Sequence, residues 1–280
     1  MKKMFMMMLA ALTWTACSND DEYDLDYFSQ KYGNTENAEE QEPSEDSGNA
    51  EGSTEPDTLT LSISYNGTTA SVIGSAGNVE VSISDADVTV TSTTEKYLQL
   101  TLSGSTPGGS LLVNSQKAWG LVLDGVSITN QSGPAINNQC SKWLYVTLAD
   151  GTENTLTDGT SYAEQPFDQK GTLFSEGQVL FRGNGTLTVN ASAKNGIASD
   201  DYIVIDGGTI TVNAAATASN GLKTNDGLTI NGGTLTIDVR GDGARGIRSE
   251  ARTTINGGQT TITTSGDCKI ETVDGVKDTT

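Results

Sequence analysis

The sequence predicts an all-β protein: a right-handed parallel β-helix, or β-solenoid, built from coils of about 24 residues. Three observations support this. Almost the same run of residues occurs three times at a spacing of 25 residues, each copy alternates apolar residues with Thr, Asp or Asn, and no window has the i, i+3, i+4 apolar pattern of a helix. A single coil cannot bury its own apolar side, so coils of this kind stack and share a core.

The first 17 residues have the composition of an export signal. Two lysines precede an apolar run from Met4 to Leu12, and small or polar residues then lead to Cys17. This order is typical of a secretory signal, and the run is shorter than the about 20 apolar residues that span a bilayer. We expect residues 1–17 to be a lipoprotein signal with Cys17 acylated. Trp14 is atypical for such a signal, and a plain cleaved signal peptide is the alternative.

Residues 18–57 form a strongly acidic segment. They hold 14 acidic residues and a single lysine, and they are almost without apolar residues after Phe28. Such a segment cannot bury enough surface to fold, so it predicts a disordered, self-repelling tether; a specific acidic recognition tail is the alternative. Its start, "CSNDDEYD", resembles the export tag of Bacteroidetes surface lipoproteins. We therefore expect an outer-membrane, cell-surface-exposed lipoprotein that contacts the membrane only through its N-terminal lipid anchor.

The composition of residues 58–280 excludes several classes of function. Their net charge is −9, and no cluster of Lys and Arg is present to bind phosphates, so nucleic acid is excluded as a partner. The chain has no histidine, which removes the common Ser-His and zinc chemistries. Cys140 and Cys268 leave open whether a disulfide forms.

Residues 58–110 alternate apolar and polar residues without a common period. We expect them to form an N-terminal β cap and the first coils, which would cover an otherwise unpaired strand edge. A jelly roll is the alternative for this part.

Residues 111–280 are expected to form the β-helix proper. Each copy of the repeat holds an Asp/Asn-Gly-Gly turn, in which glycine allows a positive φ, and the side chains of Asp206, Asn231 and Asn256 should stack as a ladder. About nine coils, each about 4.8 Å thick, would give a rod on the order of 45 Å long. The residues expected to point inward are Ile205, Ile210, Val212, Ile230, Leu235, Ile237, Ile255 and Ile262.

The last residues, "TVDGVKDTT", look like the start of a further copy of the repeat. We expect the chain to be truncated at its C-terminus, a piece of a longer protein; a half-coil that closes the stack is the alternative.

Several long motifs carry a family resemblance that extends from about Leu59 to the end of the chain. The chain resembles the secreted carbohydrate-binding parallel β-helix proteins first described from a cellulolytic clostridial organism. The motifs are "LVLDGVSITNQSGPAI", "VTLADGTENTLTDGTSY", "GTLFSEGQVLFRGNGTLTV" and the three repeats. The resemblance implies a pectate-lyase-like fold that binds plant cell-wall polysaccharide, with cellulose and polygalacturonate as ligand classes and calcium held between coils. It does not imply lyase activity.

One column of the repeat offers oxygen ligands for such a calcium ion. Side chains of neighbouring coils would lie about 5 Å apart, close enough for one cation to bridge them and to offset the repulsion of an anionic glycan. In the alternative, Ser and Thr form a hydrogen-bonded ladder and the acids are solvated. The expected ligands are Asp200, Asp201, Asn225, Asp226, Asp242 and Glu250.

A neutral glycan would instead need aromatic platforms. Trp119 and Trp143 are 24 residues apart, about one coil, and Tyr145 is nearby. Because a flat aromatic face suits a sugar ring, we expect these three to form a stacking strip; packing within the fold is the alternative.

These observations favour non-catalytic binding of a plant cell-wall or other acidic polysaccharide by a calcium-containing rod. A calcium-dependent polysaccharide lyase is one alternative, since Lys223 and Arg248 share a repeat column and could supply a basic group. Paired charges on a solvated face explain these two residues more simply. A structural or adhesive surface protein is the third possibility.

Overall fold

The computed structural model of this 280-residue chain describes residues 58–74, 77–268, 270–273 and 276–279. The expected signal (1–17), including Cys17, and the expected tether (18–57) lie outside the described residues. All regular structure in the described part is β-strand. That part contains no helix of the length and apolarity needed to cross a membrane.

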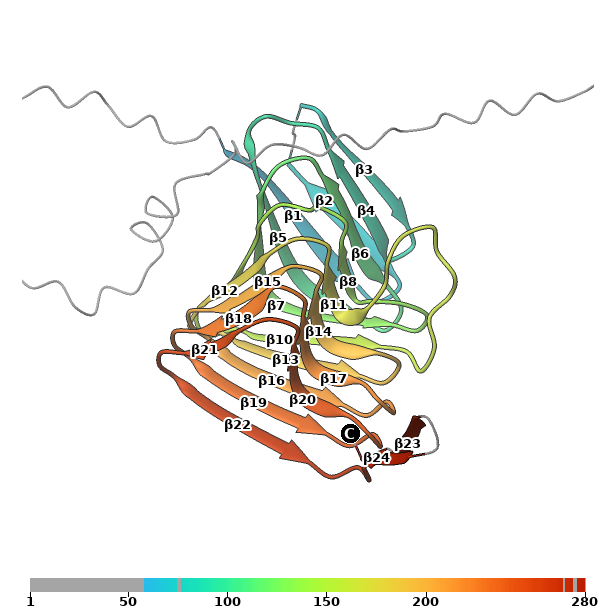
Figure 1. The fold of residues 1–280 in the computed structure, drawn as a ribbon. Helices are drawn as coiled ribbons and strands as arrows, with labels where there is room; N and C mark the ends of the chain where they lie inside the picture. Colours follow the sequence, from blue (N-terminus) through green and yellow to red (C-terminus); the bar gives the residue numbers. More distant parts are fainter. Residues whose placement is uncertain (1–57, 75–76, 269, 274–275, 280) are drawn as a thin grey trace, which may run out of the picture.

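The strands stack into a parallel β-helix of about seven turns (Figure 1). Each complete coil contributes one strand to each of three faces. Face 1 is the eight-stranded sheet, and faces 2 and 3 are the two arms of the fourteen-stranded sheet, joined by the long strand β7. The fold class predicted from the repeats is therefore confirmed, with fewer coils than the nine expected.

Face 1 contains β3 (Val79–Ser84), β4 (Asp87–Ser92), β6 (Ser110–Ser115), β8 (Ile136–Asn138), β11 (Gly171–Ser175), β14 (Asn195–Ser199), β17 (Asn220–Thr224) and β20 (Arg245–Ser249). Face 2 contains β9 (Leu144–Leu148), β12 (Val179–Gly183), β15 (Tyr202–Ile205), β18 (Gly227–Ile230) and β21 (Thr253–Ile255). Face 3 contains β10 (Glu153–Asp158), β13 (Thr186–Ala191), β16 (Thr209–Ala214), β19 (Thr234–Val239) and β22 (Gln259–Thr264). Strands β5 (Tyr97–Thr106) and β7 (Trp119–Asn130) each run along faces 2 and 3.

The N-terminal end departs from the regular coil, which is one reason why fewer coils form. Strand β1 (Thr58–Asn66) stacks in parallel on β5 but forms an antiparallel hairpin with β2 (Thr69–Ile73), and β3 forms another with β4. The β4–β6 and β5–β7 pairs are parallel, which excludes the jelly-roll alternative. A short hairpin of β23 (Ile270–Val273) and β24 (Val276–Thr279) follows the last coil.

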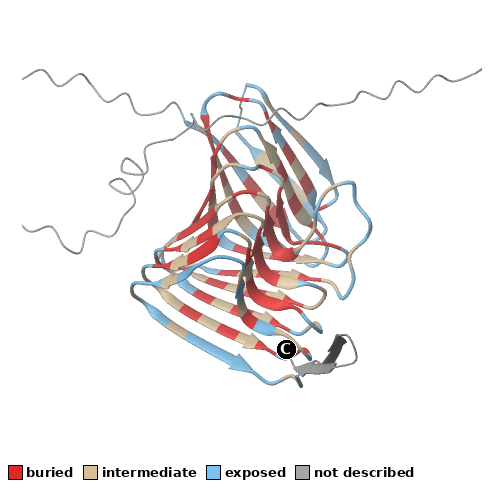
Figure 2. Cartoon of the chain, viewed as in Figure 1, coloured by how far each residue is buried: buried red, intermediate tan, exposed pale blue. Residues whose placement is uncertain are grey.

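Most of the residues expected to point inward are in the core. Ile205, Ile210, Val212, Ile230, Leu235 and Ile237 are all buried. Ile255 and Ile262 are exposed, at 57% and 46%, which corrects the prediction for these two. They belong to β21 and β22 of the last full coil, and no strand in the described part of the chain pairs with the outer side of either (Figure 2).

The Gly-Gly turns have the geometry that the repeat predicts. The second glycine of each pair has a positive φ, as at Gly233 (φ 75°). The first lies so close to the preceding coil that a Cβ atom on Gly232 would be 2.5 Å from a backbone oxygen. Asn231 Nδ2 donates to Asp206 Oδ1 at 2.8 Å, and Asn256 Nδ2 donates to Asn231 Oδ1 at 2.7 Å, so the predicted ladder is confirmed. Cys140 is buried, Cys268 is exposed, and the two are not bonded.

Candidate functional site

A loop of residues 159–170 interrupts the coil period and projects beside face 1 (Figure 1, yellow-green). Its first part is fixed by a buried carboxylate. Asp158 Oδ2 accepts a hydrogen bond of 2.7 Å from the Tyr162 hydroxyl, and Asp158 Oδ1 accepts one of 2.6 Å from the Ser192 amide. Burial raises the pKa of Asp158, and these donors partly offset that effect.

The far end of the loop is fixed to the outer side of β8. The buried Asn137 donates to the carbonyl of Asp168 at 3.1 Å, and Gln139 donates to the same carbonyl at 3.0 Å. Because both ends are held, the loop can present its side chains over face 1 in a fixed arrangement.

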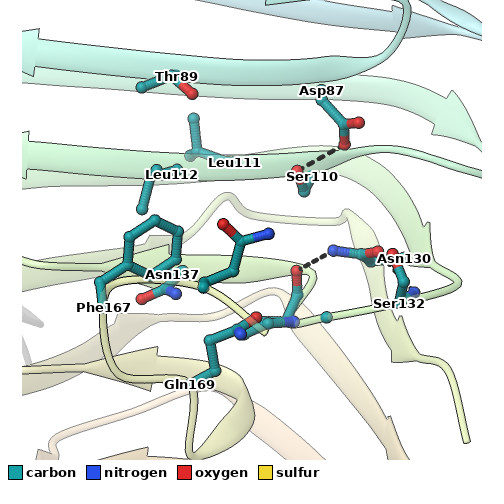
Figure 3. Close-up of a pocket in the computed structure, with 13 residues that line it drawn as sticks. Asp87, Thr89, Ser110, Leu111, Leu112, Asn130, Ser132, Asn137, Phe167 and Gln169 are labelled. Atoms are coloured by element: carbon teal, nitrogen blue, oxygen red, sulfur yellow. Dashed lines mark hydrogen bonds between the residues drawn. The ribbon is translucent and has the colours of Figure 1, made fainter. Parts of the chain in front are cut away.

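The loop and face 1 together enclose a pocket of about 270 Å³ (Figure 3). This volume is close to the lower end of the range for ligand pockets, about 300 Å³. One side is apolar, where Phe167 lies beside Leu112, with the amide of Asn137 next to them (Figure 3). The polar lining includes Asp87, Thr89, Ser110, Asn130, Ser132, Gln165 and Gln169.

The pocket offers donors and acceptors of hydrogen bonds around one aromatic ring. Ser110 donates to Asp87 Oδ1 at 2.6 Å, and Asn130 donates to the carbonyl of Pro134 at 2.7 Å, so these groups are held in place. Hydroxyl and amide groups retain capacity for further bonds, and the hydroxyls of a sugar need both kinds of partner. The geometry therefore suits a polar ligand with one flat face.

The expected aromatic strip is only partly at the surface. Trp119 is fully buried, and its indole N–H donates to Asn138 Oδ1 at 3.0 Å, so its expected contact with sugar is wrong. The physical reason is register: Trp119 pairs with Leu144, one residue after Trp143, and a slip of one residue turns a side chain to the opposite side of a strand.

Tyr145 and Trp143 lie on the outer side of face 2. Their rings are stacked, with centroids 6.0 Å apart, and Trp143 is half-buried. Tyr145 is 2% exposed because Tyr97 and Leu180 also pack around it, and burial raises its pKa to about 12. Of the three predicted aromatic residues, only Trp143 has exposed surface for a ligand.

Sequence reasoning missed Phe167 and the residues around it. The available signal was the interrupted period: Ile136 of β8 pairs with Leu173 of β11, 37 residues later instead of about 24. An insertion into a repeat forms a loop on one face, and that face is often the binding face.

The structure divides the six predicted metal ligands into separate groups. Asp201 and Asp226 lie on consecutive coils with their carboxyl groups hydrogen-bonded to each other, and the Asp226 amide donates to the Asp201 carbonyl at 3.0 Å. Burial, followed by the Asp226 carboxyl, raises the pKa of Asp201 to about 6. Two carboxylates on neighbouring coils repel each other when both are ionised, and a bound cation would offset this repulsion, so this pair fits a cation.

Asp200 and Glu250 lie beside basic side chains. Lys170 contacts both Asp200 and Asp168, and the carboxylates of Asp168, Glu176 and Asp200 form one cluster around it. Lys223 Nζ lies 3.9 Å from Glu250 Oε1. The ammonium groups therefore supply much of the positive charge that a metal ion would bring.

The remaining candidates contribute little to such a site. Asn225 accepts a hydrogen bond of 2.7 Å from Lys223. Asp242 lies in the turn before β20, at the opposite end of the face 1 strands from Asp226, where it accepts from the Asp267 amide at 3.0 Å. The neighbouring hydroxyls bond to turn carbonyls; for example, Ser199 donates to the Gly177 carbonyl at 2.9 Å.

Comparison with known proteins agrees with this architecture. A family model described as "Carbohydrate-binding domain-containing protein" matches residues 84–278. The chain belongs to this family. The match includes the loop of residues 159–170, and all residues that line the candidate pocket fall within it.

Two relatives extend the comparison. A carbohydrate-binding domain-containing protein of Acetivibrio thermocellus (strain ATCC 27405) is 38% identical over 141 residues, which is 48% of this chain and 48% of that protein. The matched part thus spans about half of that relative. The solved structure of the polysaccharide lyase-like protein from C. thermocellum, a gadolinium derivative, is similar with a TM-score of 0.56 and 28% identity, over 74% of this chain and 96% of that one.

Proposed function

We propose that this protein binds a polysaccharide without cleaving it, in the pocket (hereafter the groove) between the loop of residues 159–170 and face 1. The observation that carries the proposal is the pocket itself, in which Phe167 faces amide, hydroxyl and carboxylate groups on a rigid β scaffold. Family membership and the relatives' descriptions add support. The proposed ligand is a plant cell-wall or other acidic polysaccharide, of the polygalacturonate or cellulose-like kind.

Calcium is part of the proposal, at the carboxyl pair of Asp201 and Asp226. Calcium prefers oxygen ligands, and this pair has the unfavourable like charge that a divalent cation would neutralise. When bound there, it would join two consecutive coils. We further propose that Cys17 is acylated and holds the protein at the outer surface of the outer membrane, with the acidic segment as a tether.

The lyase alternative finds less support in the described residues. Arg248 Nη2 lies 3.4 Å from Glu250 Oε1, and the Lys223 ammonium donates a hydrogen bond to Asn225 Oδ1. Both basic groups are thus engaged with neighbouring side chains, whereas a general base must reach the proton that it abstracts.

Calorimetric titration of the full chain with soluble polygalacturonate and cello-oligosaccharides tests the proposal. We expect saturable heat with at least one of them, and a loss of about tenfold or more in affinity for Phe167→Ala. Trp143→Ala is the matched control, since it removes a half-buried aromatic ring from face 2. No binding, or a loss only in Trp143→Ala, would refute the groove; formation of unsaturated uronate products would establish a lyase.

A further inference from the structure

We propose that the groove continues along face 1 into a lysine-lined subsite, formed by Lys170, Lys194 and Lys223, that binds the carboxylate of an acidic sugar directly and without a bridging metal ion. This inference rests on the proposed function, because it names the property by which the same groove selects its glycan.

Three hollows adjoin one another along face 1. The pocket described above shares Gln165, Phe167 and Gln169 with a second hollow of about 470 Å³ beside the loop. The second shares Lys170 and Lys194 with a third hollow of about 300 Å³. The three follow the order of coils from β4 and β6 to β14 and β17, so the row crosses the strands along the direction in which the coils stack. An extended polymer in this row would contact successive coils.

Three lysines line the third hollow although the domain is acidic. Lys170, Lys194 and Lys223 line it, and none of its lining residues is Asp or Glu. Residues 58–280 carry a net charge of −9, so three lysines around one hollow depart from the general charge of the surface. Local positive charge of this kind attracts a carboxylate where the rest of the domain repels it.

Lys194 is the lysine most available to a ligand. Lys170 contacts Asp168 and Asp200, and Lys223 lies near Glu250. Lys194 is exposed, and no carboxylate in the described part of the chain forms an ion pair with it. Its ammonium donates to the Gln169 carbonyl at 2.5 Å and lies 5.0 Å from the centre of the Tyr162 ring. An ammonium group has three N–H donors, so capacity remains for a ligand carboxylate.

The test compares two glycans that differ only in charge. The full chain is titrated by calorimetry, in chelator, with oligogalacturonate and with the same oligosaccharide after reduction of its carboxyl groups. The variants are Lys194→Gln and, as a control with the same loss of charge, Lys117→Gln. Lys117 lies in the loop after β6 and forms an ion pair with Glu95.

We expect the wild type to bind the acidic form more tightly, and Lys194→Gln to weaken that form about tenfold while the reduced form is unaffected. The control should bind both as the wild type does. Equal weakening of both forms would mean that Lys194 only holds the loop, and would overturn the inference. Unchanged binding by Lys194→Gln, or equal affinity of the wild type for the two forms in chelator, would overturn it as well. Failure of the wild type to bind either form in chelator, while it binds in calcium, would refute this inference alone; failure in both buffers would count against the proposed function as well.

Discussion

At the scale of single residues, the carboxyl pair of Asp201 and Asp226 most directly links charge to stability. The pKa of Asp201 is raised to about 6 in the folded protein, above the ordinary value of 3.8, so folding disfavours its ionised form. The resulting decrease in the free energy of unfolding is absent below about pH 4, grows as the pH rises, and is fully present above about pH 6.

We therefore predict that Asp226→Asn stabilises the protein in chelator at pH 8, because it removes a like charge from the neighbouring coil. The gain should be on the order of 0.5 kcal/mol, or about 1–2 °C in Tm, and should vanish at pH 4. Calcium should raise the Tm of the wild type more than that of the variant. Scanning calorimetry checks this; equal Tm values at pH 8, or an equal calcium effect in both proteins, would show that the pair neither repels nor binds calcium.

At the scale of elements, the loop of residues 159–170 depends on a small buried polar network. The Tyr162 hydroxyl supplies one of the hydrogen bonds that keep the buried Asp158 carboxylate satisfied. When a buried acceptor loses its donor, the free energy of unfolding usually falls by about 1–3 kcal/mol.

Tyr162→Phe should lower stability by about that amount and also weaken glycan binding, because the loop that presents Phe167 loses an anchor. Tyr202→Phe is a suitable control, since it removes a hydroxyl contact of 2.7 Å with Thr229 on the outer side of face 2. Urea unfolding and calorimetric titration measure the two effects. If Tyr162→Phe binds glycan as tightly as the wild type, the loop anchor has no part in binding.

The elements also show what the sequence could and could not predict. The repeats predicted the fold, the core position of Ile237 and the ladder at Asn231, because each coil imposes the same environment on the same position. Trp119 was misplaced because the local coil is 25 residues long and the assumed spacing was 24. Phe167 lies in an insertion without period, and its place with Leu112 of β6 in the lining of one pocket depends on how the loop folds back over face 1.

At the scale of the whole molecule, stability should depend on position along the stack. Coils in the middle contact neighbours on both sides, whereas β22 pairs on one side only within the described residues. Ile237 and Ile262 occupy paired positions in consecutive coils, but only Ile237 is fully buried.

Ile237→Ala should therefore lower the free energy of unfolding by about 2–5 kcal/mol, and Ile262→Ala should lower it by less than about 1 kcal/mol. Urea unfolding of the two variants against the wild type gives both values. Similar costs would mean that the last coil is as well covered as the middle of the stack.

The central claim, that glycan binds in the groove of face 1, is tested most directly by hydrogen–deuterium exchange of the full chain with and without saturating polysaccharide. We expect slower exchange in residues 159–170 and in the adjoining strands β4, β6 and β8, with little change on face 2. Protection confined to face 2, around Trp143, would contradict it.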